Sequence, residues 1–271
     1  MSKEMSFLSH IGELRSHLVR AIIAIVIAAF AIGFNIEWVM ANIIFGPTKP
    51  DFLTFKAVNY FSRMFSGQDT IIMPPTFPIQ VRKLFEQFNM MMSISIFGGI
   101  LLAFPYLIWE VWRFIKPALR AEERKNSIFI INGTWILFVL GAMCGYFLIM
   151  PFVINFGYFF NISKEIRVDI DLSSYISLLI QVVMGMAVVF LFPMLVYILT
   201  SLGILTPVFL RTYRRHAIVV IMAIAAILTP PDVLSMVICC IPLFILYEIC
   251  IIMSMIMYRK MKRSEAALIK K

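Results

Sequence analysis

Residues 90–109 read MMMSISIFGGILLAFPYLIW, a run of 20 residues without a charged side chain. As a helix, such a run is long enough to cross the roughly 30 Å of hydrocarbon in a bilayer. Other apolar runs lie on either side of it, at residues 21–45, 127–150, 175–200, 217–229 and 233–257. The sequence therefore predicts an all-α, polytopic membrane protein with six transmembrane helices, of which the fifth and sixth spans are short.

The composition supports the same fold class. Hydrophobic residues make up 61% of the 271-residue chain and charged residues 14%, whereas soluble domains average about 45–50% apolar and about 25% charged residues. A soluble fold cannot bury this much apolar surface, so the excess must face lipid. We expect a single membrane domain over residues 1–271, in which residues 46–89 form an ordered cap with short helices on the outer face.

The distribution of Lys and Arg predicts the orientation in the membrane. Segments 1–20, 113–125, 201–216 and 258–271 together hold 17 of the 24 basic residues, and the longer outer segments hold the other 7. The positive-inside rule therefore places both termini in the cytoplasm. No cleavable signal or transit segment precedes the first span, which favours a prokaryotic plasma membrane. The basic residues form short clusters rather than a continuous stripe, so we expect no nucleic-acid partner.

The fifth apolar run, AIVVIMAIAAILT at 217–229, is unusually short. Its 13 residues give a helix of about 20 Å, roughly 10 Å less than the hydrocarbon core. Three interpretations are open: the helix draws in Arg211–Arg215 with snorkelling side chains, the bilayer thins around it, or it packs as a buried half-helix. If the bilayer thins there, the membrane is locally weakened around this helix.

The sequence offers little support for an enzyme. It lacks HExxH, GxSxG and phosphate-loop motifs. All four cysteines lie inside apolar runs, without a His or Cys at metal-binding spacing. We expect no catalytic residues, no metal and no cofactor.

Acidic residues next to the spans also stand within the basic cytoplasmic segments. Glu13 precedes the first span, and Glu122 and Glu123 lie between the second and third spans. A local interpretation gives Glu13 an i,i+4 contact with His17, and makes Glu122 and Glu123 favourable charges at a helix N-terminus. In the alternative, these carboxylates bind arginine, whose planar guanidinium donates two parallel hydrogen bonds that an ammonium group cannot reproduce.

At these residues the chain resembles a known family, the TatC subunit of the twin-arginine protein translocase. The resemblance covers nearly the whole chain, and its motifs are specific when taken together in this order. They are HIGELRSHL at 10–18, Glu86-Gln87-Phe88, FPYLIWEVWRFIKPALRAEER at 104–124, FPMLVYILTSLGILTP at 192–207 and LTPPDVLSMVICCIPLFILYE at 228–248.

The resemblance implies a receptor for signal peptides that carry paired arginines on folded, exported proteins. It implies that Glu13 and Glu123 receive the arginine pair, with further family positions at Arg15, Pro47, Phe88, Phe114 and Asp232. It also implies single-span partners resembling TatA and TatB, self-association in a receptor complex, contact with membrane lipid, and the proton-motive force as energy source.

The chain departs from the family pattern in the fourth span. Many family members have Glu or Gln two residues before the proline of that span, where this chain has Leu191. Gln181 lies ten residues earlier, about 280° around the helix, and is no obvious substitute. The lysine that often follows the E-x-F motif is also absent, with Ser93 near that place. An alternative function, a secondary carrier or channel for a small solute, would need polar groups near mid-bilayer, with Glu248 as a candidate.

Overall fold

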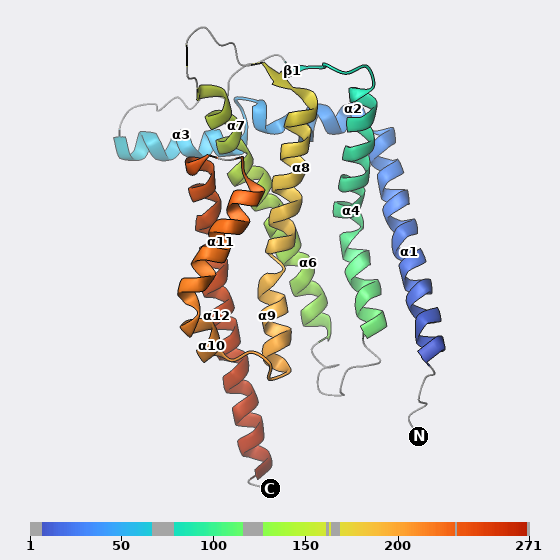
Figure 1. The fold of residues 1–271 in the computed structure, drawn as a ribbon, viewed down its shortest axis with the longest axis vertical. Helices are drawn as coiled ribbons and strands as arrows, with labels where there is room; N and C mark the ends of the chain where they lie inside the picture. Colours follow the sequence, from blue (N-terminus) through green and yellow to red (C-terminus); the bar gives the residue numbers. More distant parts are fainter. Residues whose placement is uncertain are drawn as a thin grey trace. The chain divides into compact units, whose positions relative to one another are not determined.

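The structure is a computed structural model that describes residues 7–66, 79–115, 127–160, 163, 169–230 and 232–269. Nearly all of these residues are helical (Figure 1). Five segments are long and apolar enough to cross a membrane, and they confirm the all-α polytopic fold class: Gly12–Phe34, Glu86–Phe114, Ile128–Phe159, Leu172–Ser201 and Val233–Lys262.

By its contacts the chain divides into two compact units, and the division falls within two helices. Unit 1 comprises residues 1–45, 79–136 and 170–176, and unit 2 comprises residues 46–78, 137–169 and 177–271. The chain passes between the units inside α6 (Ser127–Met143) and α8 (Leu172–Val189). The two units are described separately below.

Unit 1 is built on an antiparallel pair of long helices, α1 (Phe7–Phe34) and α4 (Glu86–Ile115), which run side by side in Figure 1. Two glycines of α4 permit the close approach. A Cβ on Gly99 would lie 2.8 Å from the backbone nitrogen of Ala29, and one on Gly98 would lie 2.7 Å from the Ile32 side chain. Larger residues at these two positions would separate the helices, since packed interiors have little free volume.

The first span ends earlier than predicted. We expected it to reach Phe45, but α1 ends at Phe34, and Asn35 has non-helical dihedral angles of φ −107° and ψ 25°. The Asn35 side chain donates to the carbonyl of Ala31, a local hydrogen bond of the kind that competes with helix propagation. The chain then continues as α2 (Ile36–Val39) and η1 (Met40–Ile44), which turn away from α1 (Figure 1). An apolar run alone does not show this turn.

Unit 1 also holds the only sheet in the described residues, a two-stranded parallel pairing of β1 (Ile79–Gln80) with β2 (Ile170–Asp171). Tyr175, at the start of α8, donates from its hydroxyl to the carbonyl of Ile44 at 2.6 Å. These contacts join three distant parts of the sequence at the predicted outer end of α4.

Unit 2 has a larger apolar core. Its first cluster consists of Ile149, Val153, Val182, Met186, Ala225, Leu228, Cys239 and Leu243, and its second of Val196, Leu210, Tyr247, Cys250 and Ile251. The contributing helices, besides parts of α6 and α8, are η4 (Cys144–Ile149), α7 (Met150–Phe159), α9 (Phe192–Ser201), α10 (Pro207–Thr212), α11 (Arg214–Leu228) and α12 (Val233–Ile269).

The fourth span is broken at a predictable place. Helix α8 ends at Val189 and α9 begins at Phe192, directly before Pro193. Proline has no N–H group and its ring clashes with the carbonyl four residues earlier, so the helix is interrupted there. The third span is longer than predicted, because η4 and α7 continue the helical path to Phe159.

The fifth helix is short, as predicted. Helix α11 has 15 residues and begins at Arg214, so it draws two arginines into its first turn, and its length of about 22 Å is still less than the hydrocarbon thickness. Val219, Val220 and Ile227 are all more than half exposed, which argues against a fully buried half-helix.

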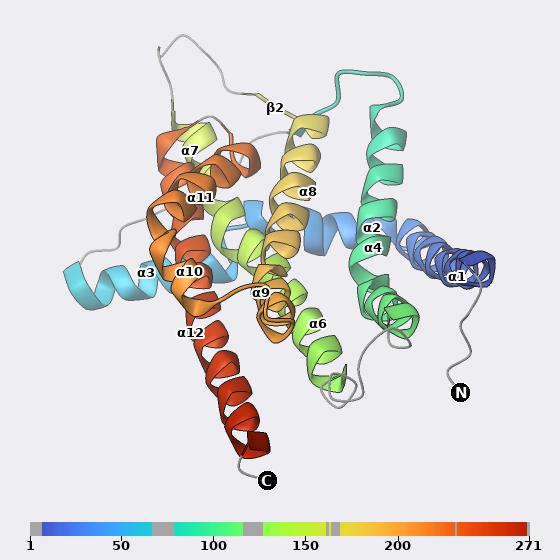
Figure 2. The same cartoon turned by 60° about the horizontal axis from the view of Figure 1, so that its bottom comes forward.

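The prediction of a short sixth span is wrong. Helix α12 has 37 residues, and Figure 2 shows it extending well past α9 and α10. After Met257 the sequence YRKMKRSEAALI is polar but rich in good helix formers, so the helix continues where the apolar run stops.

The predicted outer cap is partly helical where it is described, and it also includes the strand β1. It contains η2 (Gly46–Thr48) and α3 (Leu53–Ser66), both in unit 2. Residues 67–78 of the predicted cap lie outside the described residues.

Candidate functional site

A buried polar cluster lies at the predicted cytoplasmic end of α1 and α4, in unit 1. Its centre is the carboxylate of Glu110, which is only 2% exposed. Glu110 accepts a hydrogen bond of 2.7 Å from the Tyr106 hydroxyl, forms an ion pair with Nδ1 of His17, and lies 3.8 Å from a guanidinium nitrogen of Arg20. A buried carboxylate is tolerated in such a place because it is paired and hydrogen-bonded.

Helical spacing brings these four residues together. His17 and Arg20 are three residues apart on α1, and Tyr106 and Glu110 are four apart on α4, so each pair lies on one helix face. Phe114, one turn beyond Glu110, packs edge-on against His17 with ring centroids 6.1 Å apart. The cluster therefore joins the two helices near the point where both meet the predicted cytoplasmic surface.

Glu13 lies on α1 one turn before His17 and is exposed. Among the described residues it has neither a hydrogen bond nor an ion pair, and His17 binds Glu110 rather than Glu13. The local interpretation of Glu13 as a partner of His17 is therefore wrong. Arg15 is exposed on the same helix.

Glu123, the second predicted recognition residue, and its neighbour Glu122 lie outside the described residues. They belong to segment 116–126, which joins α4 to α6 along the chain. The predicted pairing of Glu13 with Glu123 stays a prediction.

The remaining predicted positions lie elsewhere in the chain. Pro47 is fully buried in η2. Phe88, near the start of α4, is 57% exposed and lines a cavity of about 430 Å³ in unit 1. Asp232 caps α12 by accepting a 2.6 Å hydrogen bond from the backbone N–H of Ser235, which satisfies one of the free donors of a helix N-terminus. Of these further positions, Arg15 lies on α1, and Phe88 and Phe114 lie on α4, the two helices that hold the Glu110 cluster.

Sequence reasoning missed a second buried acid, at the other end of α4. Glu86 is 2% exposed and accepts hydrogen bonds of 2.8–2.9 Å from the backbone N–H groups of Arg82, Lys83 and Ser173. It thus joins the segment before α4 to the first turn of α8. The E-x-F motif contains this residue, but the role depends on Ser173, 87 residues away.

Gln181 does not take the place of the polar residue that the family resemblance leads us to expect at Leu191. Leu191 lines an apolar pocket of unit 2, and the side-chain amide of Gln181 donates to the carbonyl of Ile227 near the end of α11. Gln181 is therefore engaged in holding α11 against α8, which fits the prediction that it does not substitute for the missing side chain.

Comparisons with known proteins agree with this architecture. The family model described as Sec-independent protein translocase protein (TatC) matches residues 9–242. Relatives include the TatC protein of Blattabacterium sp. subsp. Periplaneta americana, 40% identical over 95% of this chain and 97% of the relative. TatCy of Bacillus subtilis is 33% identical over 97% of this chain and 94% of the relative.

A solved structure shows the same fold. The crystal structure of the twin arginine translocase receptor TatC matches with a TM-score of 0.70 and 27% identity, over 92% of this chain and 99% of that chain. Protein translocation is a transport function rather than an enzymatic one, and it favours the predicted translocase over a small-solute carrier. The chain therefore belongs to the TatC family of Sec-independent protein translocase proteins.

Proposed function

We propose that this chain is the signal-peptide receptor of a twin-arginine translocase in a prokaryotic plasma membrane, with both termini in the cytoplasm. Its cargo would be folded proteins, moved at the expense of the proton-motive force together with TatA- and TatB-like single-span subunits and further copies of the chain. The observation that carries the proposal is the contrast between two acids on one helix pair. Glu110 is buried and contacts His17, Arg20 and Tyr106, whereas Glu13 is exposed and has no ion pair or hydrogen bond among the described residues.

In this proposal the exposed carboxylate of Glu13 binds one arginine of the signal peptide, and Glu123 binds the other. Arginine suits such a site because its guanidinium donates two parallel hydrogen bonds to a carboxylate, whereas a lysine ammonium acts as a point charge. A receptor of this kind therefore distinguishes an arginine pair from a lysine pair of equal charge.

The Glu110 cluster supports this role by positioning rather than by contact with the peptide. It binds His17 and Arg20, which lie one and two turns after Glu13 on α1. Because these contacts fix the end of α1 against α4, the Glu13 side chain projects from a fixed stretch of helix. A recognition site is most selective when its supporting residues are already ordered before the ligand arrives.

The test is photocrosslinking of a twin-arginine signal peptide to the full chain in membranes. Glu13→Ala and Glu123→Ala should each reduce crosslinking at least tenfold, which corresponds to about 1.4 kcal/mol of lost binding. Glu37→Ala and Glu122→Ala are the matched controls: Glu37 is an exposed acid of α2, and Glu122 adjoins Glu123. Both controls should crosslink like the unaltered chain.

A peptide with both arginines changed to lysine provides the second arm and should crosslink no better than the two site variants do. Size-exclusion chromatography in detergent reports whether each variant is folded. Normal crosslinking and export by folded Glu13→Ala and Glu123→Ala variants would refute this recognition site.

A further inference from the structure

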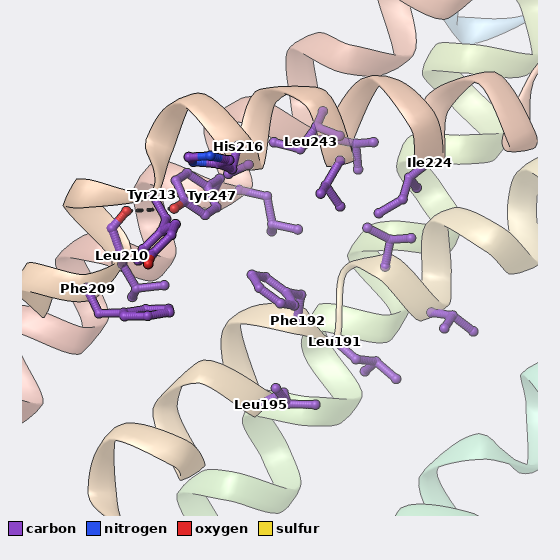
Figure 3. Close-up of a pocket in the computed structure, with 16 residues that line it drawn as sticks. Leu191, Phe192, Leu195, Phe209, Leu210, Tyr213, His216, Ile224, Leu243 and Tyr247 are labelled. Carbon is purple, nitrogen blue, oxygen red and sulfur yellow. Dashed lines mark hydrogen bonds between the residues drawn. The ribbon is translucent and has the colours of Figure 1, made fainter. Parts of the chain in front are cut away.

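Unit 2 contains an apolar pocket of about 620 Å³ between the end of α8 and helices α9, α10, α11 and α12, within the roughly 300–1,000 Å³ range of small-ligand sites. We call it the α11 pocket. Figure 3 shows its walls, in which Leu191, Phe192 and Leu195 face Ile224 and Leu243 across the space. No charged side chain lines it apart from the titratable ring of His216.

The polar groups of the α11 pocket gather at one end. Tyr213 and His216 lie together at the start of α11, with ring centroids 5.4 Å apart. Tyr247 is also there, but its hydroxyl donates to the carbonyl of Leu210 at 2.7 Å. The wall of α11 then continues through Ala217 and Val220 to Ile224 without a polar atom. The pocket is therefore polar at its predicted cytoplasmic end and apolar along the rest of its length.

Positive charge adjoins the polar end along the chain, although no arginine lines the pocket itself. Residues 211–216 contain three arginines and His216. Arg214 is neutralised by Glu248 at 2.6 Å, whereas Arg211 contacts the sulfur of Met255 and Arg215 is exposed. Neither Arg211 nor Arg215 has an acidic partner among the described residues. Arg211 and Arg215, next to the polar end in the sequence, thus carry positive charge that the described part of the chain does not compensate.

An amphiphile with one anionic end fits both features. The pocket lies between helices that belong to membrane-spanning segments, Leu172–Ser201 and Val233–Lys262, and its polar end lies in a segment that the positive-inside rule assigns to the cytoplasm. The cytoplasmic leaflet is rich in anionic headgroups, which basic residues at the surface attract. Helix α11 is shorter than the hydrocarbon thickness, so either the bilayer thins around it or its arginine side chains extend to the interface. In both cases its basic first turn lies within reach of lipid headgroups.

We propose that the α11 pocket binds one anionic phospholipid of the cytoplasmic leaflet. An acyl chain lies between α9, α11 and α12, and the phosphate lies beside Tyr213 and His216 in the field of Arg211 and Arg215. Leu191, which lines the pocket, then forms part of an apolar wall for the acyl chain. This site is independent of the arginine recognition proposed for Glu13.

Native mass spectrometry of the full chain in detergent tests the proposal with two probes, phosphatidylglycerol and phosphatidylcholine with identical acyl chains. The unaltered chain should retain one phosphatidylglycerol in preference to phosphatidylcholine. The preference should be roughly fivefold for each uncompensated arginine, the usual effect of a basic residue at an anionic surface. Arg211→Gln combined with Arg215→Gln should abolish the preference, whereas Arg259→Gln, a basic residue on α12 away from the pocket, should preserve it.

A matched pair of variants tests the acyl-chain position. Val220 lines the pocket and Val219 does not, although both are more than half exposed. Val220→Trp fills the space and should abolish retention of the lipid, and Val219→Trp should leave it unchanged. If Val220→Trp fails to fold, the double arginine variant decides alone, because it leaves the apolar walls intact.

Three outcomes would overturn the proposal. The first is equal retention of the two lipids by the unaltered chain. The second is equal loss, or equal retention, in folded Val219→Trp and Val220→Trp. The third is a Val220→Cys variant that crosslinks in native membranes to a second copy or to a single-span subunit, unaffected by added phosphatidylglycerol. That result would assign the pocket to a protein helix.

Discussion

The α1–α4 pair of unit 1 and the helices of unit 2 are held together in different ways. Only 6% of the residues in the apolar window of α1 are buried, compared with 39% in each of the windows of Ile128–Phe159 and Leu172–Ser201. Unit 1 is joined by buried carboxylates near the two ends of α4, at Glu86 and Glu110. Unit 2 is joined by two apolar clusters.

This difference matters for the proposed function. A helix that is mostly exposed keeps its faces available for partners, and the polar cluster at its end fixes its position without covering it. A densely packed unit has the opposite properties, because apolar burial stabilises it but leaves less surface for binding. The exposed carboxylate of Glu13 lies on the lightly packed helix, where an incoming peptide can reach it.

The largest effect is expected in unit 1, for Glu110→Ala. Removing one member of a buried ion pair typically costs about 3–5 kcal/mol, since its partners stay buried without compensation. Here His17 and Tyr106 would lose their shared acceptor. The measurement is the thermal midpoint of unfolding in detergent. Glu37→Ala, which removes an exposed acid of the same unit, should leave the midpoint unchanged. Equal midpoints for the two variants would show that the cluster does not stabilise the helix pair.

An intermediate effect is expected in unit 2, for Gly145→Leu. A Cβ at Gly145 would lie 2.9 Å from the carbonyl oxygen of Val182 and 3.0 Å from the Cα of Val183, so α8 must move away. Overpacking of this kind costs about 1–3 kcal/mol. Gly157→Leu is the control, because a Cβ there has no neighbour within 4 Å. The same unfolding assay should show a loss for Gly145→Leu alone, and an equal loss for both would show that the close approach of Gly145 to α8 is not the cause.

The smallest effect is a pH dependence at the outer end of unit 1. The hydroxyl of Ser173 donates to Asp171 and lowers the pKa of that carboxyl below its ordinary value of 3.8. Because the pKa is lower in the folded state, the carboxylate contributes stability above pH 3.8, and this contribution is lost as the pH falls through the folded pKa.

The thermal midpoint of the unaltered chain should therefore fall as the pH is lowered below 3.8, and that of Asp171→Asn should fall less. Parallel curves for the two proteins would contradict a contribution from Asp171.

Much of the architecture could be predicted from the sequence, because a bilayer imposes simple requirements. Runs such as 90–109 must be helical to satisfy their backbone hydrogen bonds in hydrocarbon. The short fifth helix was predicted from the length of the apolar run at 217–229. The break before Pro193 is expected because proline has no N–H group and its ring clashes with the preceding turn. The early end of α1 at Asn35 and the continuation of α12 to Ile269 were not predicted, since hydropathy measures contact with lipid rather than the extent of a helix.

The candidate site also has a part that the sequence predicted and a part that it did not. The sequence by itself determined that Glu13 and Glu123 stand among basic residues at the predicted cytoplasmic face, because charge and order along the chain are sequence properties. Only the tertiary structure decided that His17 binds Glu110, 93 residues away, and leaves Glu13 exposed. It also decided that Glu86 binds the start of α8, and that Leu191 and Val220 line one pocket. These pairings depend on which helix faces pack together. The local sequence does not decide this, because each apolar face could pack about equally well against several others, so the packing of the whole chain selects the pairs.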